Sequence, residues 1–442
     1  MPPTHLDLSE PEAHRKATLY TRCDRALDAW GAARKRWSLW VPGRIEVLGK
    51  HTDYAGGRSL VCALERGLCV RVASRRDAVV RVRSLDRRST FQTPVSRLAT
   101  GDDGSWTEYV AAVVRRLAVN FEDVRRGADI VLASDLPADA GMSSSSALVV
   151  AIFIALSKAN DLRSDPVFRS AISSSEELAA YLGAVENGLP FRHLTSGSGV
   201  GTHGGGQDHT AILCSEPGEL LRFAWDPLKR EAHLPMPAGH VFALGASGVG
   251  APKTGAALRR YNRVSLAARR VLDLWNEDTQ RSDSSLGAVI GGVSGAAEHL
   301  RSLVRRSRGG RFSRTFLEGR LEQFIAETFE IIPAASDALA RGALAEFGMA
   351  VDHSQHLAEA HLGNQVAETV TLQRLARDLG AVAASAFGAG FGGSVWAMVP
   401  KAEGKRFLRL WKAGYGRRHV RSARDARFFL SRPGPHAFQF QH

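Results

Sequence analysis

The chain has 442 residues, of which 44% are hydrophobic and 23% are charged; this predicts two domains and excludes a disordered chain, a collagen and a disulfide-rich scaffold. The net charge of +13 comes from 58 basic and 45 acidic residues, yet no nucleic-acid-binding motif accompanies the densest basic cluster, Arg301–Arg320. We interpret the charge as a solvated, arginine-rich surface and expect no nucleic-acid partner.

Neither a membrane segment nor a disulfide framework is expected. The longest apolar run, Ala147–Leu156, has about half of the ~20 residues that a membrane-spanning helix needs. The first residues, Met1–Lys16, lack the apolar core of a signal peptide. No Cys-x-x-Cys pair indicates a zinc ribbon or a thiol redox site; the cysteines are Cys23, Cys62, Cys69 and Cys214. We therefore expect a cytoplasmic protein with reduced thiols.

Strand and helix patterns alternate in the first half of the chain. Residues 1–15 are polar, and we expect them to be loosely held. A short strand at Ser38–Val41 is followed by a turn rich in Gly, His and Asp that extends to Gly57. Alternating apolar residues predict strands at 60–73 and 78–82, and a short, mostly apolar run predicts another at 128–133. Apolar residues at helical spacing predict helices at 106–119 and 176–187, and the apolar run at 147–156 predicts a buried helix.

The second half is richer in helix. A stretch of Gly and Ser at Thr195–Gly206 precedes it, and a strand at His240–Ala246 begins it. Helical spacing predicts helices at 255–276, 284–305, 318–332, 339–361 and 368–379. A strand–turn–strand unit at 382–399 follows. The fold class that we expect is therefore α+β.

Two of three glycine-rich segments resemble nucleotide-binding loops but fail on context. In Val41–Gly57, Gly43 and Gly49 enclose one residue too many for a P-loop, and the Ser or Thr that should follow the lysine is missing. Gly388–Gly393 fits the G-x-G-x-x-G pattern, but a strand pattern follows where a dinucleotide fold needs a helix. A tight turn between two strands is the simpler interpretation.

The remaining glycine-rich segment, Leu136–Ala147, has the properties of a phosphate site. A strand pattern precedes it and a buried helix follows. Small residues at a helix N-terminus leave backbone N–H groups free at the positive end of the helix dipole. A serine cap without a ligand is the alternative. One cap needs one serine, so four in a row beside Gly141 favour phosphate.

Together these segments resemble the three motifs of the GHMP kinase superfamily, and within it the galactokinase branch. Arg44–Gly57 resembles the galactokinase signature, Pro137–Ala147 the phosphate loop, and Gly388–Gly393 the third motif. Shorter pieces also resemble that branch, namely Trp106 with Tyr109, Tyr261–Arg263 and Arg432–Gly434. The resemblance runs from about residue 38 to the end of the chain.

The resemblance implies a two-domain GHMP kinase fold with the active site in the cleft between the domains. The N-terminal mixed α/β domain would comprise residues 1–230 and the C-terminal α+β domain residues 231–442. The implied activity is transfer of the γ-phosphoryl of ATP, with Mg²⁺, to the anomeric hydroxyl of galactose or a related sugar. The implied partners are the sugar and ATP, without a membrane or a nucleic acid, and the implied state is a monomer or weak homodimer.

The resemblance also assigns two residues to the chemistry. Asp208 would be the base that accepts the proton of the sugar hydroxyl. From the residues alone, Asp208 could equally cap a helix that begins at Thr210. Arg44 would hold Asp208 ionised and offset the charge that develops on the transferred phosphoryl group.

Further residues are assigned to binding. The residues implied in sugar binding are Lys50, His51, Asp53, Gly205 and Tyr261. Those implied in ATP binding are Trp106, Pro137, Gly141, Met142, Ser143, Ser144, Ser145, Ser146, Gly390 and Gly392. Ser145 and Glu186 are the implied Mg²⁺ ligands. Two of these assignments have plain alternatives, because Trp106 could be a core residue and Glu186 an ordinary charge on a helix face.

Lys50 is the main departure from the galactokinase pattern, in which a Glu stands at this position and accepts a hydrogen bond from a sugar hydroxyl. A lysine has donors only and inverts the charge. One interpretation is an acidic sugar whose carboxylate pairs with Lys50. The other is a pair between Lys50 and Glu46 or Asp53, with a neutral sugar. Glu46, where Asn is usual, and His209, where Gln is usual, are further departures.

Other functions stay open. The same fold could act on a different acceptor, such as galacturonate, arabinose, an amino sugar or a heptose. Some relatives of galactokinases are sugar and ATP sensors with little turnover. Because Asp208, Arg44 and the serine loop are all present, we favour an enzyme.

Overall fold

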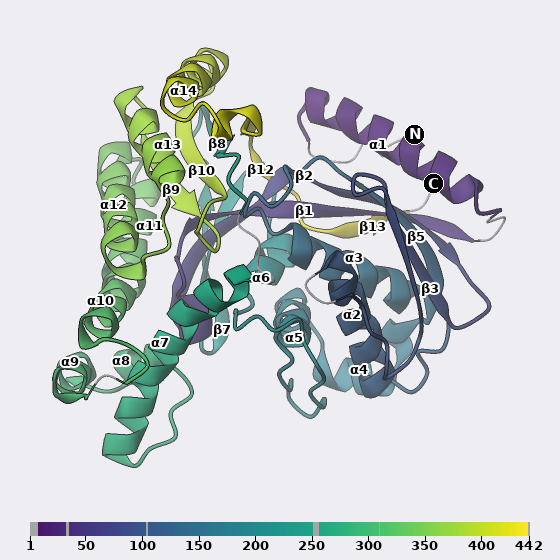
Figure 1. Cartoon of the computed structure of the whole chain (residues 1–442), viewed down its shortest axis with the longest axis horizontal. Helices are drawn as coiled ribbons and strands as arrows, with labels where there is room; N and C mark the ends of the chain where they lie inside the picture. The colour runs from purple at the N-terminus through teal and green to yellow at the C-terminus, as the bar shows by residue number, and fades with distance from the viewer. Residues whose placement is uncertain (1–7, 32–34, 103–104, 251–255, 309, 441–442) are drawn as a thin grey trace.

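The computed structural model describes residues 8–31, 35–102, 105–250, 256–308 and 310–440. Within them, two sheets and the helices around them form a mixed α and β fold (Figure 1). The expected α+β class is therefore confirmed. None of the described helices is long and apolar enough to cross a bilayer.

The larger sheet has nine described strands, which run in the order β13-β1-β2-β5-β3-β4, with β6, β7 and β12 attached through β2. The β3–β5 pair is parallel, and the other pairs are antiparallel. The strands are β1 (Arg36–Leu48), β2 (Arg58–Ser74), β3 (Val79–Ser84), β4 (Ser89–Pro94), β5 (Ala128–Ser134), β6 (Glu219–Trp225), β7 (Leu228–Pro235), β12 (Pro433–Gly434) and β13 (Phe438–Phe440).

Helices cover both faces of this sheet (Figure 1). On one face lie α2 (Trp106–Asn120), α3 (Ser144–Ala159), α4 (Pro166–Ala171), α5 (Ser175–Asn187) and α6 (Gln207–Cys214). On the other face lies α1 (Glu10–Asp28), which packs its apolar residues on Trp40, Cys69 and Val131. The expectation of a loosely held segment at 1–15 is therefore wrong from Glu10 onward, and residues 1–7 lie outside the described residues.

The smaller sheet has four described strands in the antiparallel order β11-β8-β10-β9. These are β8 (His240–Ala246), β9 (Ala383–Phe387), β10 (Ser394–Pro400) and β11 (Arg427–Ser431). Side chains alternate between its faces, so Phe242 and Leu244 face α11 and α12 while Val241 and Ala243 face α13 and α14. The expected strand–turn–strand unit at 382–399 is present as β9 and β10.

The remaining helices form the outer part of the second half (Figure 1). They are α7 (Ala256–Thr279), α8 (Leu286–Gly292), α9 (Ala296–Arg306), α10 (Arg314–Ile325), α11 (Ile332–Ala340), α12 (Leu344–Leu357), α13 (Ala367–Asp378) and α14 (Gly404–Arg418). The helix expected at 284–305 is two helices, because Gly295 between them has a left-handed backbone with φ of 75°. The helix expected at 255–276 begins at a position outside the described residues.

A shared core joins the two halves. Ile45, Leu60 and Cys62 of the larger sheet pack with Trp396 of the smaller sheet and Ile332 of α11. After β11 the chain returns to the larger sheet, where β12 pairs with β2 and β13 with β1. Residue 230 lies within β7, and the division into domains 1–230 and 231–442 stays a prediction.

Strand β1 is much longer than the strand expected at Ser38–Val41. Arg44, Ile45 and Glu46 pair with Ala63, Cys62 and Val61 of β2, so they are strand residues and not part of a turn. The register shifts near Gly43 and near Val47, where bulges bend the strand. The strand therefore carries both Arg44 and Glu46 toward α6, because residues two apart on a strand share a face.

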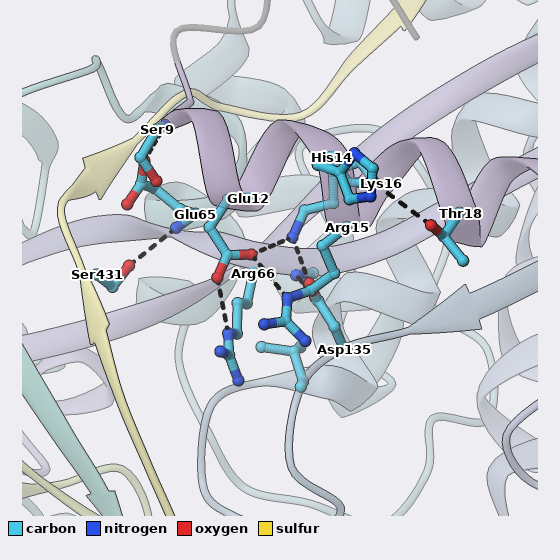
Figure 2. Close-up of polar contacts among 12 residues, drawn as sticks. Ser9, Glu12, His14, Arg15, Lys16, Thr18, Glu65, Arg66, Asp135 and Ser431 are labelled. Atoms are coloured by element: carbon cyan, nitrogen blue, oxygen red, sulfur yellow. Dashed lines mark hydrogen bonds and ion pairs between the residues drawn. The ribbon is translucent and has the colours of Figure 1, made fainter. Parts of the chain in front are cut away.

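A buried ion cluster fixes α1 beside the start of the expected phosphate loop (Figure 2). The ammonium of Lys16 is fully buried and donates to both Glu12 and Asp135, and it lies 5.0 Å from the centre of the Trp40 ring. Asp135 also accepts the backbone N–H of Gly67 at 2.8 Å. Burial raises the pKa of Asp135, and Lys16 opposes this shift. The cluster thus ties α1 to the residue before Leu136.

We expect Asp135→Asn to lower the free energy of unfolding by about 1.5–3 kcal/mol, the usual worth of hydrogen bonds to charged groups. The loss stays moderate because Glu12 remains as a counter-charge for Lys16. Urea unfolding of the variant and the wild type measures the difference. The matched control is Asp139→Asn in the following loop, whose exposed side chain should change stability by less than about 0.5 kcal/mol. Equal stability of Asp135→Asn and the wild type would contradict the expected role.

Candidate active site

Arg44 and Asp208 form an ion pair between β1 and α6. The guanidinium Nε of Arg44 donates to Oδ1 of Asp208 at 2.8 Å, and its NH1 donates to the carbonyl oxygen of Gly141 at 2.6 Å. Arg44 is only 2% exposed. Arg44 therefore joins the expected base to the expected phosphate loop.

Helix α6 begins earlier than the capping alternative requires. Its first residue is Gln207, and Gly206 occupies the N-cap position. Asp208 thus lies inside the first turn and does not cap a helix that begins at Thr210. At the N-terminal end of a helix the dipole favours a carboxylate.

A cavity opens where β1, the signature segment, α5, α6 and the third glycine motif meet. Most of the residues that line it are polar or charged. The lining residues are Arg44, Glu46, His51, Asp53, Tyr54, Ser146, Glu186, Asn187, Gly204, Gly205, Gln207, Asp208, His209, Tyr261, Gly388 and Ala389.

Four of the five residues expected to bind the sugar line this cavity. His51 is held at both ring nitrogens, by the Tyr54 hydroxyl at 3.0 Å and the Ala389 carbonyl oxygen at 3.3 Å. Asp53 accepts the backbone N–H of Gln207 at 3.1 Å. A side chain at Gly205 would collide with the Asp53 carboxylate, so only glycine allows this close approach. The fourth of these residues is Tyr261.

Lys50 does not lie with the other four. The residue is 2% exposed, and its ammonium donates to Oγ of Ser354 in α12 at 2.9 Å. Ser354 in turn donates to Oε1 of Glu327 at 3.0 Å, and that oxygen also accepts the backbone N–H of Gly49 at 2.7 Å. Burial lowers the pKa of Lys50, and Glu327 and Glu46 oppose the shift.

Glu327 and Ser354 were not anticipated from the sequence. They stand about three hundred residues away from Lys50 along the chain and belong to no motif. Glu327 lies in a π-helical segment, Ala326–Ile331, between α10 and α11. Such segments are frequent at functional sites, but their hydrogen-bond pattern has no signature in the sequence.

The phosphate loop and the third motif are in contact. Ser394 donates to the carbonyl oxygen of Ala140 at 2.7 Å, and a Cβ on Gly388 would lie 2.7 Å from the carbonyl oxygen of Gly141. Gly141 and Ser143 both have left-handed backbones, with φ of 71° and 60°. This turn aims the start of α3 toward the cavity, where helix N–H groups are free to bind an anion.

Three family models match the chain. The GHMP kinases N terminal domain matches residues 108–216, the galactokinase galactose-binding signature residues 31–74, and the GHMP kinases C terminal domain residues 335–416. These matches together include more than half of the chain and contain the phosphate loop, Arg44 and the third motif. The chain belongs to the GHMP kinase superfamily. Its expected resemblance to the galactokinase branch is confirmed as well.

Individual relatives point to the same branch of the GHMP kinases. The galactokinase of Actinobacillus pleuropneumoniae serotype 5b is 34% identical over 115 residues, which is 26% of this chain and 30% of that protein. The chain thus spans about a third of the length of the first curated relatives that it matches. The galactokinase of Chloroflexus aggregans is 27% identical over 383 residues, 86% of this chain and 88% of that protein.

A solved structure shares the fold. The crystal structure of Lactococcus lactis galactokinase complexed with galactose superposes with a TM-score of 0.75. The match covers 95% of this chain and 98% of that one at 20% sequence identity. The two-domain GHMP kinase architecture expected from the sequence is therefore confirmed.

The serine loop of this GHMP kinase places its hydroxyls differently from the expectation. Helix α3 begins at Ser144 and not at Ala147, so three serines lie in its first turn. Oγ of Ser146 donates to Oε2 of Glu186 at 3.0 Å, and Ser146 lines the cavity, whereas Ser145 does not. Ser143 is buried, and its hydroxyl has no hydrogen-bond partner among the described residues.

The other residues expected to bind ATP do not line the cavity. Trp106 is the first residue of α2, where it is partly buried and packs edge-on against Phe91 with ring centres 6.4 Å apart. Pro137 and Met142 lie in the phosphate loop, and Gly390 and Gly392 in the third motif have φ of 80° and 130°. Their part in ATP binding stays a prediction.

Glu46 is a buried carboxyl of the GHMP kinase cavity. Its Oε2 accepts a hydrogen bond from Nε2–H of Gln207 at 2.6 Å, while Oε1 has no hydrogen-bond partner among the described residues. Burial raises the pKa of Glu46 to about 7, against the opposing effects of Arg44, Lys50 and Gln207. Between the ordinary value of 4.5 and this raised value, the folded protein binds a proton that the unfolded chain has lost. Stability must therefore fall as pH rises through this window.

We expect Glu46→Gln to be more stable than the wild type at pH 8 by about 2–3 kcal/mol, because the Glu46 carboxyl has a raised pKa in the folded protein and regains its ordinary pKa in the unfolded chain. The two proteins should converge near pH 4.5, because both side chains are then neutral. Urea unfolding between pH 4.5 and pH 8 measures this difference. A difference that does not change with pH would contradict the raised pKa.

Proposed function

We propose that this GHMP kinase is a galactokinase, which transfers the γ-phosphoryl of ATP to the anomeric hydroxyl of galactose. The observation that carries the proposal is the Arg44–Asp208 pair, whose arginine also donates to the carbonyl oxygen of Gly141 in the phosphate loop. The full-length relative from Chloroflexus and the superposed Lactococcus structure are both galactokinases by name, and the latter was solved with galactose.

In the proposed reaction, the protein mainly positions groups and supplies charge. The Asp208 carboxylate accepts the proton of the sugar hydroxyl as its oxygen attacks the γ-phosphorus, and ADP leaves. Arg44 provides a fixed positive charge beside this carboxylate and beside the phosphate loop. His51, Asp53 and Tyr261 would orient the sugar through directed hydrogen bonds.

The donor atoms present fit a magnesium ion. The Glu186 carboxylate and the Ser146 hydroxyl, 3.0 Å apart at the cavity wall, would hold it together with phosphate oxygens. When bound, the ion supplies neutralisation of the phosphate charge. The described residues hold no group of three or more His, Cys, Asp or Glu side chains that could bind a metal ion. The site thus suits a cation that arrives with the nucleotide.

The proposal extends to the state and place of the protein. We propose a monomer or weak homodimer that works in the cytoplasm on ATP and a free sugar. The four cysteines are buried and unpaired, which suits a reducing compartment. We propose that the sugar substrate is uncharged, because the Lys50 ammonium bonds to Ser354 and Lys50 does not line the cavity.

The test is ADP release from Mg-ATP with galactose, N-acetylgalactosamine, arabinose, galacturonate and glucuronate. We expect release that depends on galactose, with galactose 1-phosphate as the product in ³¹P NMR spectra. Turnover with a uronic acid alone would overturn the proposed substrate. ATP binding without release on any of these sugars would overturn the proposed activity and favour a sugar or ATP sensor.

A further inference from the structure

His209 follows the expected base in α6 and is one of the most deeply buried side chains of the cavity wall. It is 1% exposed and lines the same cavity as Asp208 and Glu186. Neither ring nitrogen makes a hydrogen bond with any of the described residues. A buried imidazole with two unsatisfied nitrogens is costly. The site therefore offers a nitrogen that a ligand can satisfy.

The imidazole lies within ion-pair distance of Glu186 but makes no hydrogen bond with it. Nε2 of His209 is 3.2 Å from Oε2 of Glu186, yet the direction of approach does not meet the geometry of a ring N–H hydrogen bond. Two ligands of one octahedral ion, each at 2.0–2.1 Å, lie about 3 Å apart. The observed spacing is thus that of neighbouring ligands. Oγ of Ser146, 3.0 Å from the same carboxylate oxygen, adds a third donor.

We infer that the imidazole of His209 is a ligand of the divalent cation that accompanies ATP in this site. The inference rests on the proposed function only for the presence of the nucleotide. Glu186, Ser146 and His209 supply one carboxylate, one hydroxyl and one nitrogen, and phosphate oxygens and water complete the set. Mn²⁺ and Co²⁺ are transition-metal ions that accept an imidazole nitrogen more readily than Mg²⁺, which prefers oxygen ligands. The chain should therefore bind Mn²⁺ more tightly, relative to Mg²⁺, than a site made of oxygen ligands.

The direct test is the electron spin-echo modulation of Mn²⁺ bound to the full chain with ADP. A coordinated imidazole gives ¹⁴N modulation, which we expect in the wild type. The modulation should be absent in His209→Gln and retained in His203→Gln, a matched control whose histidine is exposed in the loop before α6. Wild-type protein that binds Mn²⁺ and ADP without ¹⁴N modulation would overturn the inference. That result comes from the wild type and does not depend on whether the variants fold.

A second measurement follows binding strength. Titration of Mn²⁺ into the protein with ADP, read from the signal of free Mn²⁺, should give a Kd at least about tenfold higher in His209→Gln than in the wild type. The Kd for Mg²⁺, measured by competition, should change less. Equal losses for both ions would overturn the nitrogen ligand. These readouts need no turnover, so the two proposals can fail separately. If ¹⁴N modulation is present but no sugar is phosphorylated, the proposed function alone is rejected. If a sugar is phosphorylated but ¹⁴N modulation is absent, only His209 as a metal ligand is rejected.

Discussion

Asp208→Asn is expected to lower kcat for galactose phosphorylation by about 10²–10⁴, the usual contribution of a positioned general base. The amide has the shape of the carboxylate and can still accept Nε–H of Arg44, which the carboxylate accepts at 2.8 Å. It cannot accept the proton of the sugar hydroxyl. The loss should therefore appear in kcat, while calorimetry should show ATP binding close to that of the wild type. Steady-state kinetics at saturating Mg-ATP measures the effect.

The matched control is Asp53→Asn, a second carboxylate of the same cavity. Asp53 accepts the backbone N–H of Gln207, and an amide oxygen can replace it there. Because Asp53 is assigned to sugar binding and not to proton transfer, its change should raise KM for galactose more than it lowers kcat. A variant Asp208→Asn that keeps more than a tenth of the wild-type kcat would show that Asp208 is not the base.

The parts of this site that follow from local sequence were predicted well. The three glycine-rich segments each lie within a short stretch of chain, and their backbone requirements can be recognised from the residues alone. The Arg44–Asp208 contact joins one of these segments, which contains Arg44, to the start of α6. Family resemblance anticipated this contact because both residues belong to recognisable motifs. The strand and helix patterns around the motifs likewise fixed the fold class.

Helix phase was harder to predict, and it decides which serine faces Glu186. Successive residues of an α-helix are separated by about 100° around the axis. The apolar pattern placed the start of the helix at Ala147, whereas it begins at Ser144. With the serines inside the helix, the hydroxyl that reaches Glu186 belongs to Ser146 and not to Ser145. Apolar periodicity could not reveal this, because serines at a helix start carry no periodic signal.

Contacts between distant segments could not be predicted. Helix α1 is polar enough to look like a loose terminus, yet its Lys16 lies buried between Glu12 and Asp135. The direction of the Lys50 side chain depends on Glu327 and Ser354, which only the packed second half brings near. Both cases involve buried charges whose partners are far away in the sequence, and no local rule identifies such partners.

Lys50→Met is expected to lower the free energy of unfolding by about 3–5 kcal/mol, because removal of one partner leaves a buried opposite charge. Glu327 is fully buried, and its Oε2 already has no partner among the described residues. Its Oε1 accepts the backbone N–H of Gly49 and the hydroxyl of Ser354, and no cationic side chain among the described residues donates a hydrogen bond to it. Urea unfolding measures the loss. The control Lys412→Met, at an exposed position of α14, should cost less than about 0.5 kcal/mol.

The double variant Lys50→Met/Glu327→Gln separates charge pairing from simple packing loss. Glutamine can still accept the N–H of Gly49 and the hydroxyl of Ser354, and it carries no charge to be compensated. If the charge of Lys50 compensates the charge of Glu327, the double variant should recover most of the stability lost in Lys50→Met, with a coupling energy of about 2 kcal/mol or more. Additive losses would contradict a coupled pair.

Lys50→Glu distinguishes the buried pair from a substrate contact. This change restores the residue typical of galactokinases but places a second carboxylate beside Glu327, so it should destabilise the protein at least as much as Lys50→Met does. Adding Glu327→Gln should relieve the repulsion and restore stability. Because the Lys50 ammonium bonds to Ser354 and neither residue lines the cavity, none of these changes should switch the substrate from a uronic acid to galactose. A stable Lys50→Glu variant that exchanges uronate turnover for galactose turnover would instead make Lys50 the residue that recognises an acidic sugar.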